Sequence, residues 1–228
     1  LRGSESRQAF LLRLSDRLRP LTDPAEVQYE AARGLGEYLG ANRVGYGEAG
    51  EDGETIVVTR TWTSGVPGIE GRYRYDDYGP ELLRAFREGR TVVRPDIAND
   101  PTLTETEKAA HAALQLGATV NVPLVKAGRL VAVLFIHHRQ AHAYTEDEVS
   151  LVEAVADRTW GAVARARAET ALRDNEARLR LALDVAELGT WTWDLETGTG
   201  DIDPRGARIV GLPPGPVENI AQAQRSTI

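Results

Sequence analysis

The stretch GATVNVPLVKAGRLVAVLFIHH, residues 117–138, decides the fold. It reads as two strands joined near Ala127-Gly128, a pair suited to the turn of a hairpin. Both alternating sets of the second strand are apolar: Leu130, Ala132, Leu134 and Ile136 on one side, Val131, Val133 and Phe135 on the other. Such a strand is usually central in its sheet and covered on both faces. The stretch therefore predicts a central hairpin with layers on both sides.

Three histidines, His137, His138 and His142, lie at the end of this strand and just beyond it. Successive strand residues point to opposite faces, so His137 and His138 cannot bind one ion together while the strand stays regular. His142 falls in the following connection. We therefore expect a strand that runs into a polar loop, and no metal site.

The segments before the hairpin alternate between helical and strand-like patterns. A first amphipathic helix places Leu11, Leu14, Leu18 and Leu21 at helical spacing. A second begins at Asp23-Pro24 and ends at Gly40. Two strands follow, NRVGYGEA (42–49) and ETIVVTRTWT (54–63), joined by a hairpin turn at GEDG.

An irregular aromatic segment then leads to short elements and a long helix. Residues 64–80 are irregular, and a short helix, a short strand TVV and the polar connection RPDIANDP follow. Another helix is predicted from Thr104 to about Leu116. After the central hairpin, Thr145 and Glu148 form a capping box that opens a helical run of roughly forty residues, about 60 Å long.

Composition limits the class of protein. The 228 residues are 42% hydrophobic and 27% charged, and the net charge is −7, so binding to nucleic acid or to an anionic membrane is not expected. No apolar run reaches the roughly 18 residues of a membrane span, and no signal peptide is recognised. The chain has no cysteine, which removes disulfides, thiol nucleophiles and thioether-linked chromophores. We expect a cytoplasmic protein.

Three pieces of sequence resemble GAF domains of bacterial sensory proteins. They are VVRPDIANDPTLTETEKAA (92–110), LGATVNVPLVKAGRLVAVLFIHH (116–138) and AYTEDEVSLVEAVADRTWGAVARARAE (143–169). The resemblance spans residues 5–168 and implies an α+β fold with an antiparallel sheet of roughly five or six strands. It also implies terminal helices on one face and a pocket on the other, under the irregular segment.

The sequence after this region resembles the start of a PAS domain. The pieces are LRDNEARLRLALDVAELGTWTWDLETGTG (172–200) and DPRGARIVGLPPG (203–215), with a strand around Trp191 and Trp193 and a turn at LETG. We expect a helical linker over residues 169–186 and a partial PAS-like domain over 187–228. A GAF domain followed by a PAS domain is typical of sensor histidine kinases. No Gly-rich nucleotide loop or phosphoacceptor histidine is recognised here, so catalysis would belong to the parent protein.

The resemblance to GAF domains implies a set of pocket residues. They are Tyr46, Trp62, Tyr73, Tyr75, Asp76, Asp77, Tyr78, Arg94, Asp96, Asn121, Phe135 and His137. The segment GRYRYDDYGP (71–80) looks like a polar and aromatic lid over a concave site. The alternative is that its tyrosines anchor a loop and its aspartates cap the next helix.

The absence of cysteine limits the ligands that the resemblance to GAF domains allows. Covalent attachment of a bilin in this domain needs a cysteine, as does catalysis in the methionine sulfoxide reductase branch of the family, and the chain has none. The cyclic-nucleotide signature is not recognisable. Haem bound through His111 or His137 is not expected, since a lone histidine is more often structural. The alternative is a domain that binds no ligand.

The long helix carries two apolar stripes. Its first half contains Val152, Ala156, Thr159, Val163 and Ala166, and its second half contains Ala168, Leu172, Asn175, Leu179 and Ala182. The two stripes change phase near residues 165–167. In a parallel coiled coil they would form the seam of a homodimer, with Asn175 setting the register. Alternatively, the first half only covers its own domain's sheet.

These observations predict a sensory and dimerisation module of a bacterial signal-transduction protein, of the two-component sensor histidine kinase type. Ligand binding or a conformational change would be passed on through the connecting helix. One alternative is a small-molecule enzyme with Asp76, Asp77 and His137 as acid-base groups. Another is a structural connector whose pocket is filled by its own side chains.

Overall fold

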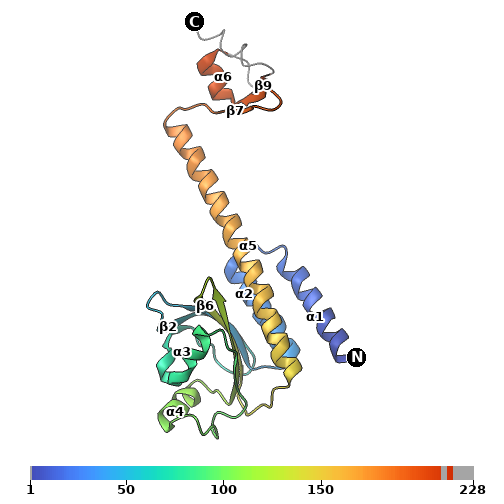
Figure 1. Cartoon of the computed structure of the whole chain (residues 1–228), viewed down its shortest axis with the longest axis vertical. Helices are drawn as coiled ribbons and strands as arrows, with labels where there is room; N and C mark the ends of the chain where they lie inside the picture. The colour runs from blue at the N-terminus through green and yellow to red at the C-terminus, as the bar shows by residue number, and fades with distance from the viewer. Residues whose placement is uncertain (1, 212–214, 218–228) are drawn as a thin grey trace. The chain divides into compact units, whose positions relative to one another are not determined.

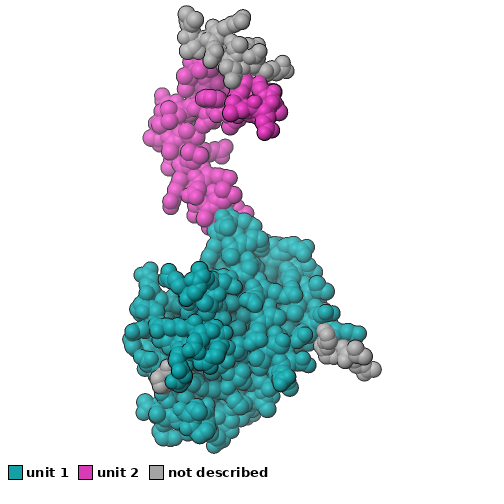
Figure 2. All heavy atoms as spheres, in the orientation of Figure 1, with its two compact units in different colours: residues 1–169 teal, residues 170–228 magenta. Residues whose placement is uncertain are grey.

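The structure is a computed structural model that describes residues 2–211 and 215–217. Its two compact units are residues 1–169 and residues 170–228 (Figure 2). Among the described residues no helix is long and apolar enough to cross a membrane.

Unit 1 is built on a six-stranded antiparallel sheet with the order β3-β2-β1-β6-β5-β4 (Figure 1). The strands are β1 (Arg43–Ala49), β2 (Thr55–Thr63), β3 (Gly71–Arg74), β4 (Val92–Arg94), β5 (Ala118–Lys126) and β6 (Arg129–His138). The predicted α+β class is confirmed, and β6 is a central strand, paired with β1 and β5.

The central hairpin turns where the sequence predicts. Ala127 and Gly128 separate β5 from β6, and both have positive φ, 50° and 73°. Two successive residues of this kind match the right-handed twist of paired strands. The turn therefore fixes the pairing of Lys126 with Arg129 beside it, and after a one-residue shift at Leu124 the register is regular as far as Ala118 and His138.

Three helices cover one face of the sheet, which we call the helical face. They are α1 (Arg2–Leu18), α2 (Pro24–Leu39) and the first part of α5 (Glu146–Val185), as Figure 1 shows. Leu14, Leu35, Leu134, Ile136 and Val152 meet in the core between these helices and the sheet. This is the larger hydrophobic core of unit 1.

Local sequence sets the ends of the helices. Asp23 accepts a hydrogen bond from the amide of Ala25, and Gly40 ends α2 with φ 63°. Thr145 and Glu148 form the expected capping box at the start of α5. Two predicted ends differ from the structure: α1 stops at Leu18, and the helix that begins after Thr104 stops at Ala113 because Gln115 adopts φ 56°.

The opposite face of the sheet, which we call the pocket face, is covered by shorter elements. They are the 3-10 turn η1 (Tyr75–Tyr78) and the helices α3 (Pro80–Arg87) and α4 (Glu105–Ala113). Tyr75, Leu82 and Phe86 pack here against Val133 of β6. The predicted irregular aromatic segment thus becomes β3 and η1, the beginning of a lid over the sheet.

Unit 2 contains the end of α5 and a three-stranded antiparallel sheet with the order β7-β8-β9. Its elements are β7 (Trp191–Asp194), β8 (Thr199–Ile202), α6 (Pro204–Val210) and β9 (Gly215–Val217). The predicted strand at Trp191 and Trp193 and the turn at residues 195–198 are present. Residues 212–214 and 218–228 of the expected PAS-like segment lie outside the described residues.

Candidate functional site

A pocket of about 80 Å³ lies between the pocket face of the sheet and the lid. Its floor comes from β2, β5 and β6: Ile56, Val58, Thr119, Asn121, Val133, Phe135 and His137. Its cover is Ile69, Tyr73, Arg74, Tyr75, Tyr78, Leu82, Phe86, Arg94, His111, Leu114 and Leu116. Pockets for drug-sized ligands begin near 300 Å³, so this one has room only for a small molecule or several waters.

Glycines in β1 let side chains of the neighbouring strands lie across it. A Cβ atom on Gly45 would stand 2.7 Å from Cζ of Phe135, and one on Gly47 would stand 2.2 Å from Cδ1 of Ile56. Both approaches are closer than real Cβ contacts. The floor above β1 is thus formed by Phe135 and Ile56, whose positions need these two glycines.

Arg43 of β1 is fully buried and links the floor to the lid. Its Nε and Nη2 donate to the carbonyl of Pro67 at 3.1 and 2.7 Å, and its Nη1 donates to the carbonyl of Leu114 at 3.1 Å. Nη1 also lies 3.3 Å from Nδ1 of His137. Burial lowers the pKa of Arg43 from its usual value. One side chain therefore joins β1, β6, the loop before β3 and the segment after α4.

His137 is neutral and its tautomer is fixed. Because a guanidinium only donates, Nδ1 of His137 must accept from Arg43, which leaves the proton on Nε2. Burial, then the charge of Arg43, holds the pKa of His137 well below its usual value. The ring stacks on Phe135 with centroids 4.7 Å apart.

Arg94 and His111 form the side of the pocket near α4. Arg94 Nη1 donates to the carbonyl of Tyr78 at 3.2 Å, and its Nε lies 3.6 Å from Oδ2 of Asp100. Nδ1 of His111 lies 2.7 Å from the carbonyl of Glu107, so Nδ1 carries the proton. Burial lowers the pKa of both Arg94 and His111. The His111 ring meets Tyr78 edge-on, with centroids 5.1 Å apart.

The lid tyrosines are held mainly by apolar and ring contacts. Tyr73 donates its hydroxyl to the carbonyl of Ile69 at 2.8 Å, and Tyr75 packs edge-on against Phe86. The buried Tyr75 hydroxyl has no hydrogen-bond partner among the described residues. Burial raises the pKa of Tyr75 and of Tyr78 to about 12, so both are neutral donors at physiological pH.

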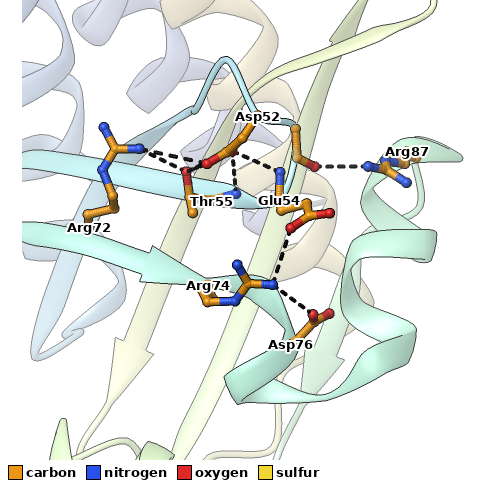
Figure 3. Close-up of polar contacts among 8 residues, drawn as sticks. Asp52, Glu54, Thr55, Arg72, Arg74, Asp76 and Arg87 are labelled. Atoms are coloured by element: carbon orange, nitrogen blue, oxygen red, sulfur yellow. Dashed lines mark hydrogen bonds and ion pairs between the residues drawn. The ribbon is translucent and has the colours of Figure 1, made fainter.

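Polar contacts tie the lid to the turn between β1 and β2 (Figure 3). Arg74 bridges Glu54 at 3.2 Å and Asp76 at 3.3 Å. From α3, Arg87 donates to the carbonyl of Gly53 at 2.9 Å. The side chains of Arg74, Glu54 and Asp76 are about half exposed or more, so solvent screens and weakens their contacts. We call these contacts the lid latch.

A known protein family matches this chain. The family model of the GAF domain matches residues 23–163, more than half of the chain. The chain belongs to the GAF domain family. No curated protein matches the chain.

Solved structures share the GAF fold at low identity. The phycoerythrobilin-bound GAF domain from a cyanobacterial phytochrome is 18% identical, with 72% of this chain and 97% of that chain covered and a TM-score of 0.63. The free methionine-R-sulfoxide reductase of Neisseria meningitidis, solved with its substrate, is 17% identical over 72% and 91%, with a TM-score of 0.59. A bacteriophytochrome of the photosynthetic bacterium R. palustris is 14% identical over 77% and 41%, with a TM-score of 0.66.

Seven of the twelve candidate residues line the pocket of this GAF domain: Tyr73, Tyr75, Tyr78, Arg94, Asn121, Phe135 and His137. Tyr46 and Trp62 lie on the helical face, where Tyr46 pairs with Leu134 and Trp62 packs against Gly36 of α2. The structure thus separates these two aromatic residues from the other candidates.

The three candidate aspartates do not line the pocket. Asp76 belongs to the lid latch, and Asp77 is exposed. Asp96 accepts hydrogen bonds from Asn99 in the polar connection. The alternative enzymatic site would need Asp76 and Asp77 beside His137, and the fold does not bring them together.

Several pocket residues were missing from the predicted set, among them Ile56, Val58, Thr119, Val133 and the residues that follow α4. Thr119 and Val133 have a recognisable signal, because they alternate with Asn121 and Phe135 along the same strands. Arg43 and His111 have no such signal, because one is an arginine in a strand and the other is a lone histidine in a helix.

The histidines at the end of β6 lie as predicted, on opposite faces. His137 lines the pocket, whereas His138 stacks on His142 with centroids 4.0 Å apart. Nδ1 of His138 is 2.9 Å from the hydroxyl of Tyr144. Within the described residues no cluster of three or more His, Cys, Asp or Glu could hold a metal ion.

The predicted seam of the long helix divides at the end of unit 1. Val152, Ala156 and Val163 are buried in the core of the helical face. Leu172 and Leu179 are 60% and 61% exposed, and Asn175 is also exposed. The first half therefore covers its own sheet, whereas Leu172, Asn175 and Leu179 of the second half are exposed.

Proposed function

We propose that this chain is a sensory and dimerisation module of a bacterial signal-transduction protein. Occupancy of the pocket would change the lid and β6, and α5 would carry the change onward. The observation that carries the proposal is the double role of β6, which contributes residues to the pocket and to the core beneath α5.

Alternate residues of β6 serve the two layers. Val133 and Phe135 line the pocket, whereas Leu134 and Ile136 pack in the core that contains Val152 and Val155 of α5. A ligand that displaces Phe135 moves the backbone between these layers. Close-packed cores shift between discrete arrangements more readily than they deform continuously. A small displacement of β6 would therefore shift α5.

The lid is the second element whose position a ligand would change. Its polar attachment to the rest of unit 1 includes the exposed contacts of the lid latch, which are individually weak. A ligand that contacts the lid tyrosines would add contacts comparable in strength to the latch. Binding would thereby change how firmly the lid is held to the turn between β1 and β2.

Dimerisation is assigned to the second half of α5. Ala168, Leu172, Asn175, Leu179 and Ala182 follow one another at spacings of four and three residues. This spacing makes a continuous seam in a parallel coiled coil, where a buried asparagine sets the register. In a dimer, the paired helices would bury the exposed leucines of both chains and connect the two GAF domains.

The proposed setting is a cytoplasmic sensor histidine kinase whose catalytic domains lie in the parent protein. Supporting it are the sequence pattern of residues 172–215, which is similar to the start of a PAS domain, and the helix that enters it. Unit 2 would receive the signal from α5 and pass it to the output domain.

The small volume of the pocket also supports a second candidate, a ligand-free connector. A pocket of about 80 Å³ excludes a tetrapyrrole in this conformation, and the chain offers no cysteine for one. In this alternative, the side chains of Phe135 and the lid tyrosines fill the site, and α5 alone transmits conformational changes.

Native mass spectrometry of the purified protein, compared with its denatured mass, tests the proposal. We expect a dimer that carries added mass on each chain, and the added mass identifies the ligand class. A dimer of bare chains would favour the connector. A monomer at every concentration tested would contradict the proposed mechanism.

A further inference from the structure

The pocket floor carries an excess of hydrogen-bond donors. Because Nδ1 of His137 accepts from Arg43, Nε2–H is left as a donor with no partner among the described residues. His137 is only 7% exposed and lines the pocket. Nε2 is not one of the fully buried atoms without a partner, so a molecule in the pocket can reach this donor and accept its hydrogen.

Two neighbouring side chains add further donors. Thr119 pairs with His137 across the hairpin, and Asn121 lies two residues along β5. Nδ2 of Asn121 donates to Oγ1 of Thr119 at 3.0 Å, so Oγ1 is already an acceptor. The Thr119 hydroxyl hydrogen and the second Asn121 amide hydrogen have no acceptor among the described residues, and Oδ1 of Asn121 is the one acceptor of this group that receives no hydrogen bond there. We call Thr119, Asn121 and His137 the donor triad.

The unbalanced charge nearest the donor triad is positive. The described pocket lining includes no aspartate or glutamate, and its two arginines, Arg74 and Arg94, already pair with carboxylates outside the lining. Behind His137, Arg43 is bonded to carbonyls and forms no ion pair with a described carboxylate. The carboxylate with the largest effect on it, Glu70, is bound instead by the amide and hydroxyl of Thr61.

The charge of Arg43 can act on a ligand in the pocket through His137. An acceptor on Nε2–H would complete a chain in which Arg43 donates to Nδ1 and Nε2 donates to the ligand. Bonds in such chains polarise one another, and a charged acceptor strengthens them further. The neutral imidazole, kept so by burial and by Arg43, stays a donor on this side.

The walls and the volume limit the rest of the ligand. Ile56, Val58 and Phe135 present apolar surface beside the donor triad. A pocket of about 80 Å³ suits a short chain attached to one charged group.

We propose that the pocket binds a small carboxylate, whose oxygens accept hydrogen bonds from the donor triad and whose charge is balanced by Arg43. This inference rests on the proposed sensory function and gives it a ligand class.

Three molecules of similar size test the charge preference. Propionate, propionamide and propylammonium are titrated into the full chain at constant ionic strength, with chloride as the reference anion, and backbone amide resonances are followed. We expect propionate to bind at least about tenfold more tightly than propionamide, and propylammonium not to bind.

Two substitutions at one position test the geometry. In His137→Asn the side-chain oxygen takes the place of Nδ1, which keeps the contact with Arg43 and removes the donor to the pocket. In His137→Gln the amide nitrogen takes the place of Nε2 and restores the donor. Propionate affinity should fall about tenfold or more in the first variant and recover in the second.

Thr119→Val removes another donor without touching Arg43, and it serves if His137→Asn fails to fold. An undiminished affinity for propionate in folded Thr119→Val and His137→Asn would overturn the proposal. Equal binding of propionamide would also overturn the carboxylate class, while the pocket would keep its proposed sensory role. Failure of all three molecules to bind overturns it too, and added mass in native mass spectrometry would then show whether the sensory function survives.

Discussion

Arg43 shows what one buried residue does for the GAF domain. Its guanidinium satisfies the carbonyls of Pro67 and Leu114 as well as Nδ1 of His137. A methionine would fill part of the space and leave these buried acceptors unpaired, at roughly 1–3 kcal/mol for each. We predict that Arg43→Met lowers the free energy of unfolding by about 2–5 kcal/mol, measured by urea denaturation.

Arg90→Met is the matched control, because the Arg90 side chain is 55% exposed and its ion pair is with the exposed Glu88. It should change the free energy of unfolding by less than about 1 kcal/mol. If both variants were equally stable, the carbonyls around Arg43 would have to be satisfied by water in its absence.

The buried histidines predict how stability depends on pH. Burial lowers the pKa of His111, His137 and His138 below the usual 6.5. At pH values between the lowered pKa of each folded histidine and about 6.5, the unfolded chain binds more protons than the folded one. Stability therefore rises with pH in this range and is lost as the pH falls below about 6.5. Each histidine adds a slope of up to about 1.4 kcal/mol per pH unit.

Urea denaturation between about pH 5 and pH 7.5 measures this slope. Carboxylates with lowered pKa, such as Glu70 and Glu148, lose their contribution only below their usual 4.5, outside this window. His137→Asn should reduce the slope relative to the unchanged chain. A slope of zero in the unchanged chain would mean that these imidazoles titrate alike when folded and unfolded.

At the scale of single elements, two glycines of α2 have opposite roles. A Cβ on Gly36 would lie 2.2 Å from Cζ3 of Trp62, whereas one on Gly34 would make ordinary contacts of 3.6 Å with Arg17 and Leu14. Alanine favours a helix over glycine by about 1 kcal/mol. We predict that Gly34→Ala raises the free energy of unfolding by up to about 1 kcal/mol, and that Gly36→Ala lowers it.

Thermal and urea denaturation of the two variants side by side checks this pair. Each substitution makes the same chemical change on the same helix, so the difference reports the contact with Trp62. Equal effects would show that the Trp62 ring can move aside at little cost.

The same tryptophan shows where sequence patterns stop being informative. Val58 and Trp62 lie four residues apart in β2, so regular alternation would place both side chains on the same face of the sheet. In the structure Val58 lines the pocket and Trp62 lies on the helical face. The cause is a β-bulge between β1 and β2, where Thr59 and Arg60 both lie opposite Tyr46. Alternation predicted β5 and β6 correctly because their register is regular along the segment that forms the pocket floor.

The helix ends and the central hairpin could be predicted because their signals are local. Asp23, Gly40 and Thr145 act on neighbouring backbone groups, and Ala127-Gly128 closes a turn between adjacent residues. The pocket was only partly predictable, since its cover and floor come from segments far apart in the sequence. The link from Arg43 to Leu114 spans seventy-one positions and leaves no trace in either segment.

At the scale of the whole molecule, the proposed dimer depends on the second half of α5. Leu172 and Leu179 lie one heptad apart on the seam and are largely exposed in a single chain. We predict that the double substitution Leu172→Glu and Leu179→Glu weakens dimerisation by about a hundredfold or more, measured by sedimentation equilibrium.

Leu181→Glu is the control, because Leu181 is equally exposed at 64% but lies on the other side of the helix from Leu179. The stability of the GAF domain should be the same in all three chains, since none of these leucines belongs to its core. A dimer that survives the double substitution would place the interface elsewhere.

The two outer strands of the sheet limit the ways in which this protein can associate. β3 has four residues and carries Arg72 and Arg74, and β4 has only three residues. Short, charged borders give an extended peptide little backbone to pair with, and they discourage the strand-by-strand stacking that leads to amyloid. We therefore expect binding partners of the GAF domain to contact its helices and not to extend its sheet.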